Sequence, residues 1–158
     1  MLQELTIHNY AIIDELTIQF NEQLNIITGE TGAGKSILMG ALSLILGERA
    51  DTSVLVNKER KCIIEGQFLA GQKKAVSEFL QANDFEDGNT SLITIRREIA
   101  SNGKSRAFIN DTPATLQQFI SLTNPLIYPI NFCSIKMNMV VDSFQFIGNI
   151  LQFNLTRF

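Results

Sequence analysis

Residues 29–36 read "GETGAGKS", and they constrain the fold more than any other stretch of the chain. They fit the pattern G-x-x-x-x-G-K-[ST] at every specified position. Before them, residues 24–28 form an apolar run typical of a strand buried on both sides. After them, residues 36–46 are apolar on almost every side, which predicts a central helix. The sequence therefore predicts an α/β fold, with a mixed sheet around that helix and an additional antiparallel β lobe.

This glycine-rich stretch suits a nucleoside triphosphate. Glycines allow backbone conformations in which successive N–H groups converge on an anion, and the following helix directs its positive end to the same point. Lys35 adds a charge for the β- and γ-phosphates, and the Ser36 hydroxyl is the predicted ligand for Mg²⁺. The predicted nucleotide-binding residues are Gly29, Glu30, Thr31, Gly32, Ala33, Gly34, Lys35 and Ser36. The pattern does not separate ATP from GTP.

Composition sets the broad class. The chain has 158 residues, of which 45% are hydrophobic and 18% charged, as expected for one globular domain with an apolar core. A net charge of −3 excludes a uniformly basic coat for nucleic acid but leaves room for a local basic face. Cys62 and Cys133 lie far apart, so we interpret both as reduced, buried residues. The N-terminus does not predict a signal peptide, and no apolar run reaches membrane-spanning length.

Hydrophobic periodicity predicts the remaining elements. Alternating residues predict strands at 2–8, 15–20 and 61–68, and the first two form an antiparallel pair. Gly47 is the predicted terminator of the central helix, and residues 73–82 predict a second helix with one apolar face. Strands "LITIRREI" and "KSRAFIN" are joined by the turn "ASNG", which predicts a hairpin. Pro113 is expected at the first position of a short helix, "PATLQQFISL".

The chain changes character near residue 129. Residues 129–158 hold only three charged residues but five of the eleven phenylalanines, and their periodicity is poor. We therefore interpret residues 1–128 as the domain and 129–158 as an atypical tail, either frameshifted or disordered. A hypothesis of frameshift or truncation is tested by sequencing the source gene downstream of codon 128.

The stretch from "MLQELTIHNYAIIDEL" through "GETGAGKS" to "GERAD" resembles the N-terminal head of the RecN family of bacterial DNA repair proteins, relatives of the SMC (structural maintenance of chromosomes) ATPases. The later "IRREIASNGKSRAFINDTPATLQQF" is similar to that family's hairpin and following helix. The resemblance covers residues 1–127. It implies part of an ABC/SMC-type head with the P-loop NTPase fold, which binds ATP and Mg²⁺.

The resemblance also implies partners. In that family a C-terminal half-head completes the ATPase, and ATP lies between two heads, so a homodimer is expected. The full-length protein acts on DNA in recombinational repair of double-strand breaks, in the bacterial cytoplasm with the nucleoid and without a membrane. This chain lacks the family's coiled coil, signature helix and Walker B carboxylates, so we predict no catalytic residue within it. It is interpreted as an ATP-binding half-head that does not hydrolyse ATP alone; the alternatives are a small P-loop kinase or GTPase, or an inert truncated remnant.

Other polar residues allow two interpretations. By resemblance, Arg49 and Asp51 face the nucleotide or the opposing head; equally, they belong to a solvated loop. Asn9 lies where the family has loop residues near the nucleotide, although this stretch carries no arginine. His8 is interpreted as a partly exposed strand residue, because no second metal-type residue is spaced to join it.

Four basic residues gather on the predicted hairpin: Arg96, Arg97, Lys104 and Arg106. Such residues could contact DNA phosphates without base specificity. Arg96 and Arg97 are adjacent in a strand, however, so they point to opposite faces and do not form one continuous patch. We therefore favour a solvated hairpin over a DNA contact.

Overall fold

The structure, a computed structural model, describes residues 1–21, 25, 27, 34–49, 55–71, 73–85 and 91–127. Within them one six-stranded sheet has the order β2-β1-β3-β4-β5-β6, and every neighbouring pair is antiparallel. The strands are β1 (Leu2–Tyr10), β2 (Ile13–Gln19), β3 (Cys62–Leu69), β4 (Leu92–Ile99), β5 (Ser105–Ile109) and β6 (Thr112–Ala114). The helices are α1 (Gly34–Ile45), α2 (Lys74–Ala82) and α3 (Leu116–Ile127). The predicted α/β class is thus confirmed.

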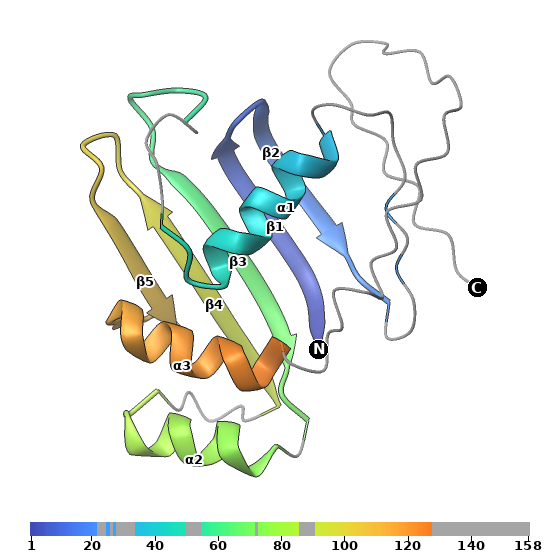
Figure 1. The fold of residues 1–158 in the computed structure, drawn as a ribbon, viewed down its shortest axis with the longest axis vertical. Coiled ribbons are helices and arrows are strands. Elements are labelled where there is room, and N and C mark those ends of the chain that lie inside the picture. The colour runs from blue at the N-terminus through green and yellow to red at the C-terminus, as the bar shows by residue number, and fades with distance from the viewer. Residues whose placement is uncertain are drawn as a thin grey trace.

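The helices lie on one face of the sheet. α1 crosses it over β1, β3 and β4, α3 lies over β5, and α2 packs beside α3 (Figure 1). β3 and β4 alternate between buried and half-buried residues along their whole length, because one side of each strand faces the helices. At Gly66 of β3 a Cβ atom would lie 3.1 Å from Ile45 Cδ1 of α1. The absence of that atom lets α1 approach the sheet closely.

α1 ends at the predicted terminator. Gly47 has φ 97°, a left-handed conformation that glycine adopts without strain. Its N–H donates to the Leu44 carbonyl at 3.2 Å, and the Glu48 N–H donates to the Ser43 carbonyl at 3.1 Å, so the last carbonyls of the helix are satisfied. A side chain at Gly47 would also overlap Ile120 of α3. This glycine therefore both stops α1 and allows α3 to pack against its end.

Most predicted strands are confirmed. β1 pairs with β2 across a two-residue turn, and the predicted strand at 61–68 corresponds to β3 between β1 and β4. The hairpin turn after β4 closes through a hydrogen bond of 2.9 Å from the Ala100 N–H to the Lys104 carbonyl, with Gly103 at φ 81°. The helix predicted at 73–82 is α2. The strand predicted at 24–28 is described only at Asn25 and Ile27, so a mixed sheet stays a prediction.

The prediction for Pro113 was wrong. Pro113 lies in β6, opposite Phe108, and not at the start of a helix. A proline is tolerated there because β6 is the edge strand of the described sheet, where a missing N–H removes no ladder bond. α3 begins later, after Thr115, whose Oγ1 accepts a bond from the Gln118 N–H at 3.2 Å. Gln118 Oε1 accepts the Thr115 N–H at 3.0 Å in return, which is a reciprocal capping box.

Replacing Thr115 with alanine is expected to destabilise the protein by about 0.5–2 kcal/mol, because the cap of α3 is lost. The free energy of unfolding in urea measures this effect. Thr112→Ala is the matched control, since Thr112 is an exposed β6 residue outside the cap. Equal stability of the Thr115→Ala variant and the wild type would contradict the capping role.

The prediction that Cys62 is a reduced, buried residue is confirmed. Its thiol is free and 0% exposed, and burial raises its pKa to about 12. Cys133 and the proposed tail, residues 129–158, lie outside the described residues, so the division at residue 128 stays a prediction. No helix in the described ranges has the length and apolar character needed to cross a membrane.

Candidate nucleotide-binding site

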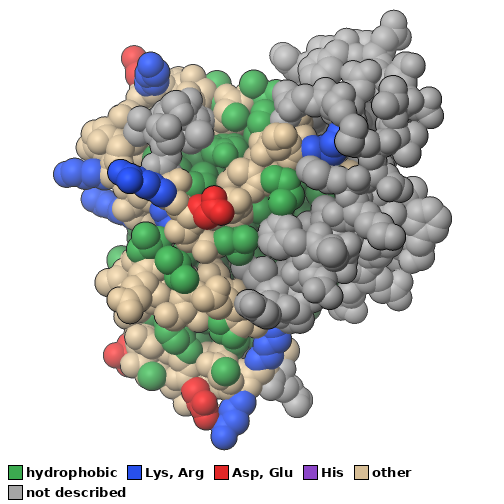
Figure 2. Space-filling view, in the orientation of Figure 1, with side chains coloured by type: hydrophobic (Ala, Val, Ile, Leu, Met, Phe, Trp, Pro, Cys, Tyr) green, Lys and Arg blue, Asp and Glu red, His purple; other side chains and the backbone are tan. Residues whose placement is uncertain are grey.

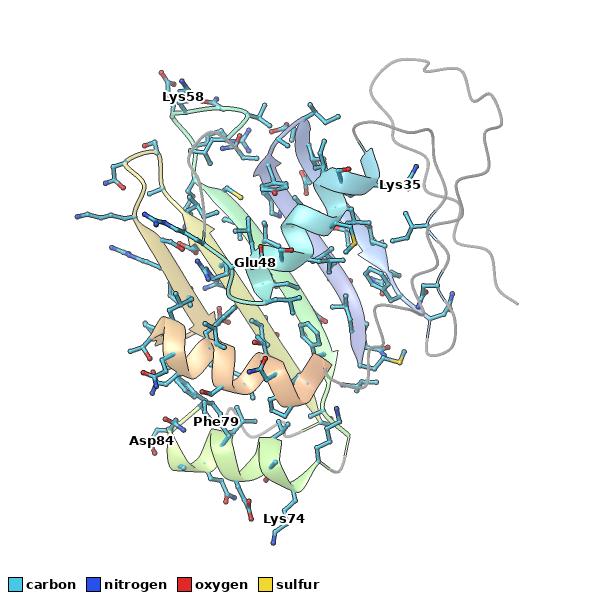
Figure 3. The ribbon with its side chains drawn as sticks, viewed as in Figure 1. Lys35, Glu48, Lys58, Lys74, Phe79 and Asp84 are labelled. Carbon is cyan, nitrogen blue, oxygen red and sulfur yellow. The ribbon has the colours of Figure 1, made fainter. Side chains whose placement is uncertain are left out.

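The described part of the predicted phosphate loop is the first turn of α1. Gly34, Lys35 and Ser36 open the helix, and Lys35 projects from its N-terminal end (Figure 3). Lys35 is 9% exposed, whereas Ser36 is exposed to solvent. No acidic residue occupies this first turn, so no carboxylate within the turn offsets the positive end of the helix dipole. The remaining predicted ligands lie outside the described residues; these are Gly29, Glu30, Thr31, Gly32 and Ala33.

The described residues before and after the predicted loop are buried. Ile27, just before it, is 5% exposed, and Leu38, one turn into α1, is 1% exposed. Tyr10 of β1 reaches the middle of α1, where a side chain at Gly40 would overlap its hydroxyl. Burial raises the pKa of Tyr10, so this hydroxyl stays protonated at neutral pH. The middle of α1 is therefore held against β1.

The side chain of Asn9 forms hydrogen bonds with backbone groups of the segment between α1 and β3. Asn9 is fully buried with φ 53°, a left-handed conformation that asparagine tolerates better than most residues. Its Nδ2 donates to the carbonyls of Asn57 at 2.9 Å and Arg60 at 2.7 Å, and its Oδ1 accepts the Asn57 N–H at 2.6 Å. The amide thus holds the connection between α1 and β3 against β1. Sequence reasoning did not identify this role.

The described residues of "GERAD", Gly47, Glu48 and Arg49, lie at the other end of α1. Glu48 is at the C-terminal end in Figure 3, and Arg49 follows it as an exposed residue. A helix of 12 residues spans about 18 Å, so Arg49 and Lys35 do not share one phosphate site within this chain. Contact of Arg49 with an opposing head stays a prediction, and Asp51 lies outside the described residues. His8 is half-buried and lies 4.0 Å from Glu15, and the described residues contain no metal-type cluster.

The basic hairpin residues separate as the alternation predicts. Arg96 lies on the sheet face opposite the helices and forms ion pairs with Glu65 at 3.4 Å, Glu98 at 3.4 Å and Asp111 at 2.5 Å. Arg97 lies on the helix-bearing face and is 3% exposed. The solvated interpretation is therefore wrong for Arg97, because its strand position faces the core.

Lys104 and Arg106 are exposed, as a solvated hairpin requires. Basic side chains lie along the β5 margin of the molecule in Figure 2. Since Arg96 is paired with acids and Arg97 is buried, the four residues do not form one basic surface. A DNA contact through this hairpin stays a prediction for its exposed members only.

Residues 4–146 match the family described as "AAA domain". The chain belongs to this family. Among curated relatives, it is 36% identical over 129 residues to the DNA repair protein RecN of Haemophilus influenzae and 39% identical over 127 residues to that of Vibrio cholerae. These matches cover 81% and 80% of this chain but 23% of each relative, so the chain spans about a quarter of their length. The predicted resemblance to RecN is thereby confirmed.

Solved structures confirm the fold of this AAA-family segment. A structure from work on ATP-driven dimerization and DNA-stimulated activation of SMC ATPases has a TM-score of 0.61 at 15% identity, covering 80% of this chain and 79% of that chain. The recombination mediator protein RecF-ATP has a TM-score of 0.55 at 17% identity, covering 72% of this chain and 27% of that chain. The predicted P-loop NTPase head of SMC type is thus confirmed as a fold, and the segment is RecN-like.

Proposed function

We propose that this chain is the N-terminal half of a RecN-like ATPase head, which binds ATP and Mg²⁺ through residues 29–36. The observation that carries the proposal is the position of Lys35 and Ser36 in the first turn of α1, held by buried residues on both sides. A charged amine, a hydroxyl and the positive end of a helix together suit a triphosphate. The name of the RecF-ATP structure, which shares the fold, supports ATP as the nucleotide.

The donor set also suits magnesium. The exposed Ser36 hydroxyl at the start of α1 is an oxygen ligand of the kind that Mg²⁺ binds together with phosphate oxygens. When bound, the ion would neutralise charge on the phosphates. Lys35 would hold the same phosphates by charge, and the N–H groups of Gly34 and its predecessors would orient them. We infer that no residue of this chain activates water, so hydrolysis requires a second segment.

The proposed partners follow from the relatives. The chain spans about a quarter of the RecN proteins, and the remainder would supply a second half-head. ATP-driven dimerization is named for the SMC structure, and we propose a homodimer of completed heads that acts on DNA in double-strand break repair. We place this protein in the bacterial cytoplasm, with the nucleoid. A small kinase or GTPase receives no support from the matched family and relatives.

A nucleotide competition assay tests the proposal. The 158-residue chain is titrated with a fluorescent ATP analogue in Mg²⁺ and then competed with ATP or GTP, while phosphate release is followed separately. We expect displacement by ATP and no phosphate release above the buffer rate. Strong preference for GTP would favour a GTPase, and an absence of nucleotide binding would favour an inert remnant. Phosphate release with multiple turnovers would contradict the half-head.

A further inference from the structure

A cavity of about 430 Å³ lies at the β5–β6 margin of the sheet, formed by elements other than α1. Its volume is within the range of small-molecule sites. Arg97 and Ser105 supply its polar wall on the helix-bearing face, and Ala107, Ala114 and Leu116 supply apolar wall. Arg106, Phe108 and Pro113 border the cavity along the β5 and β6 backbone. No carboxylate is among the described residues that line it. The cavity therefore combines the positive charge of Arg97 with apolar surface.

Arg97 is an unusual component of this wall. Its side chain is nine-tenths buried, and a buried arginine normally pairs with a carboxylate. Here Nη2 donates to Ser105 Oγ at 2.7 Å, and the guanidinium carbon lies 5.6 Å from the centre of the Phe119 ring. Nε and Nη1 are buried without an acceptor among the described residues. Burial lowers the pKa of Arg97, and an anion beside the guanidinium would offset that cost.

The N-terminus of α3 provides independent support. Leu116, the first residue of this 12-residue helix, lines the cavity, and the first turn of the helix contains no acidic residue. Thr115 Oγ1 accepts the Gln118 N–H, which leaves the N–H groups of Leu116 and Gln117 without an acceptor in the described part of the chain. The positive end of a helix dipole favours an anion at the same wall as Arg97.

We propose that this cavity binds a small organic anion, with a carboxylate or phosphate at Arg97 and the start of α3, and an apolar body against Ala114 and Leu116. Arg106, which is exposed, attracts the ligand by charge at the rim. The site is separate from the proposed nucleotide site, since it uses β4, β5, β6 and α3. An oxyanion in the cavity stabilises the charge of Arg97, which has no carboxylate partner among the described residues, and the apolar walls select against inorganic anions of similar charge.

NMR titration of the full 158-residue chain tests this site with benzoate, phenyl phosphate and neutral benzamide as probes. We expect at least one anion to shift the backbone amides of Ser105, Ala107 and Leu116 saturably, and the tighter of the two identifies the preferred headgroup. Benzamide should leave these amides in place. The proposal is overturned if neither anion shifts them, or if benzamide shifts them to the same extent.

Three variants locate the anion. Arg97→Met removes the charge with little loss of volume and should weaken the tighter probe at least tenfold. Ala114→Leu fills the cavity without removing a charge, and it decides the question should Arg97→Met fail to fold. Lys35→Ala should leave probe binding unchanged, which separates this site from the nucleotide site. Unchanged affinity in Ala114→Leu, or loss of probe binding in Lys35→Ala, would refute the assignment.

Discussion

Lys35→Ala is expected to weaken Mg-ATP binding by about 1.5–3 kcal/mol, or roughly 10- to 150-fold, without unfolding the protein. The reason is electrostatic, because the amine at the start of α1 would contact the β- and γ-phosphates, which carry most of the negative charge of the ligand. The loss should fall on the affinity for triphosphate more than on that for adenosine. Isothermal titration calorimetry with ATP, ADP and adenosine measures this difference.

Lys74→Ala is the matched control for that substitution. Lys74 begins α2, its side chain is 88% exposed, and it pairs at 3.4 Å with Glu78 of the same helix. Removing it changes net charge by the same amount, so a general charge effect would weaken ATP binding in both variants. Loss confined to Lys35→Ala supports the site. Equal affinities in wild type and Lys35→Ala would remove the basis for the proposed function.

Phe119→Ala is expected to be the most destabilising single truncation in α3, at about 3–5 kcal/mol. Phe119 is fully buried beneath the helix, and its ring lies beside the Arg97 guanidinium. Alanine would leave a void and would remove the aromatic surface that covers a buried charge. Guanidinium denaturation followed by circular dichroism gives the change in the free energy of unfolding.

The neighbouring residue in the same helix provides the comparison. Ile120 is 36% exposed, so Ile120→Ala removes a large side chain from a site that already contacts solvent. We expect it to cost less than half of the loss seen for Phe119→Ala. Similar losses for the two variants would mean that α3 is not packed on the sheet by the face that carries Phe119.

Period-two alternation was enough to predict β1, β2 and β3, because burial of one sheet face imposes that pattern directly on a strand. The three-residue edge strand β6 was not predicted. The order of the strands could not be read in this way, since β1 pairs with β3 across more than fifty intervening positions. Two neighbouring sequence signals also predicted different starts for α3. Pro113 suggested a helix start, while the pair Thr115 and Gln118 contained the actual capping box.

The sequence also predicted part of the candidate site. Lys35 and Ser36 lie at the helix start that the loop pattern requires, whereas the loop residues 29–33 stay a prediction. The burial of Arg97 had a signal, because Arg97 shares strand parity with Ile95 and Ile99. The sequence prediction instead followed the charge of Arg97 and placed this residue in solvent. The sequence contained no local signal for the hydrogen bonds of the Asn9 amide, because the partner residues are 48 and 51 positions away.

The position of β1 between β2 and β3 also determines when a growing chain can assemble this part of the sheet. β1 and β2 are joined by a tight turn and can pair as soon as residue 19 has emerged. The β3 partner of β1 is complete only at residue 69, and the phosphate-loop segment lies between the two events. Closing that long connection carries an entropy cost that local hairpins avoid. During synthesis the first hairpin therefore forms before its β3 neighbour is available, and α1 gains its contact with β3 only after residue 69.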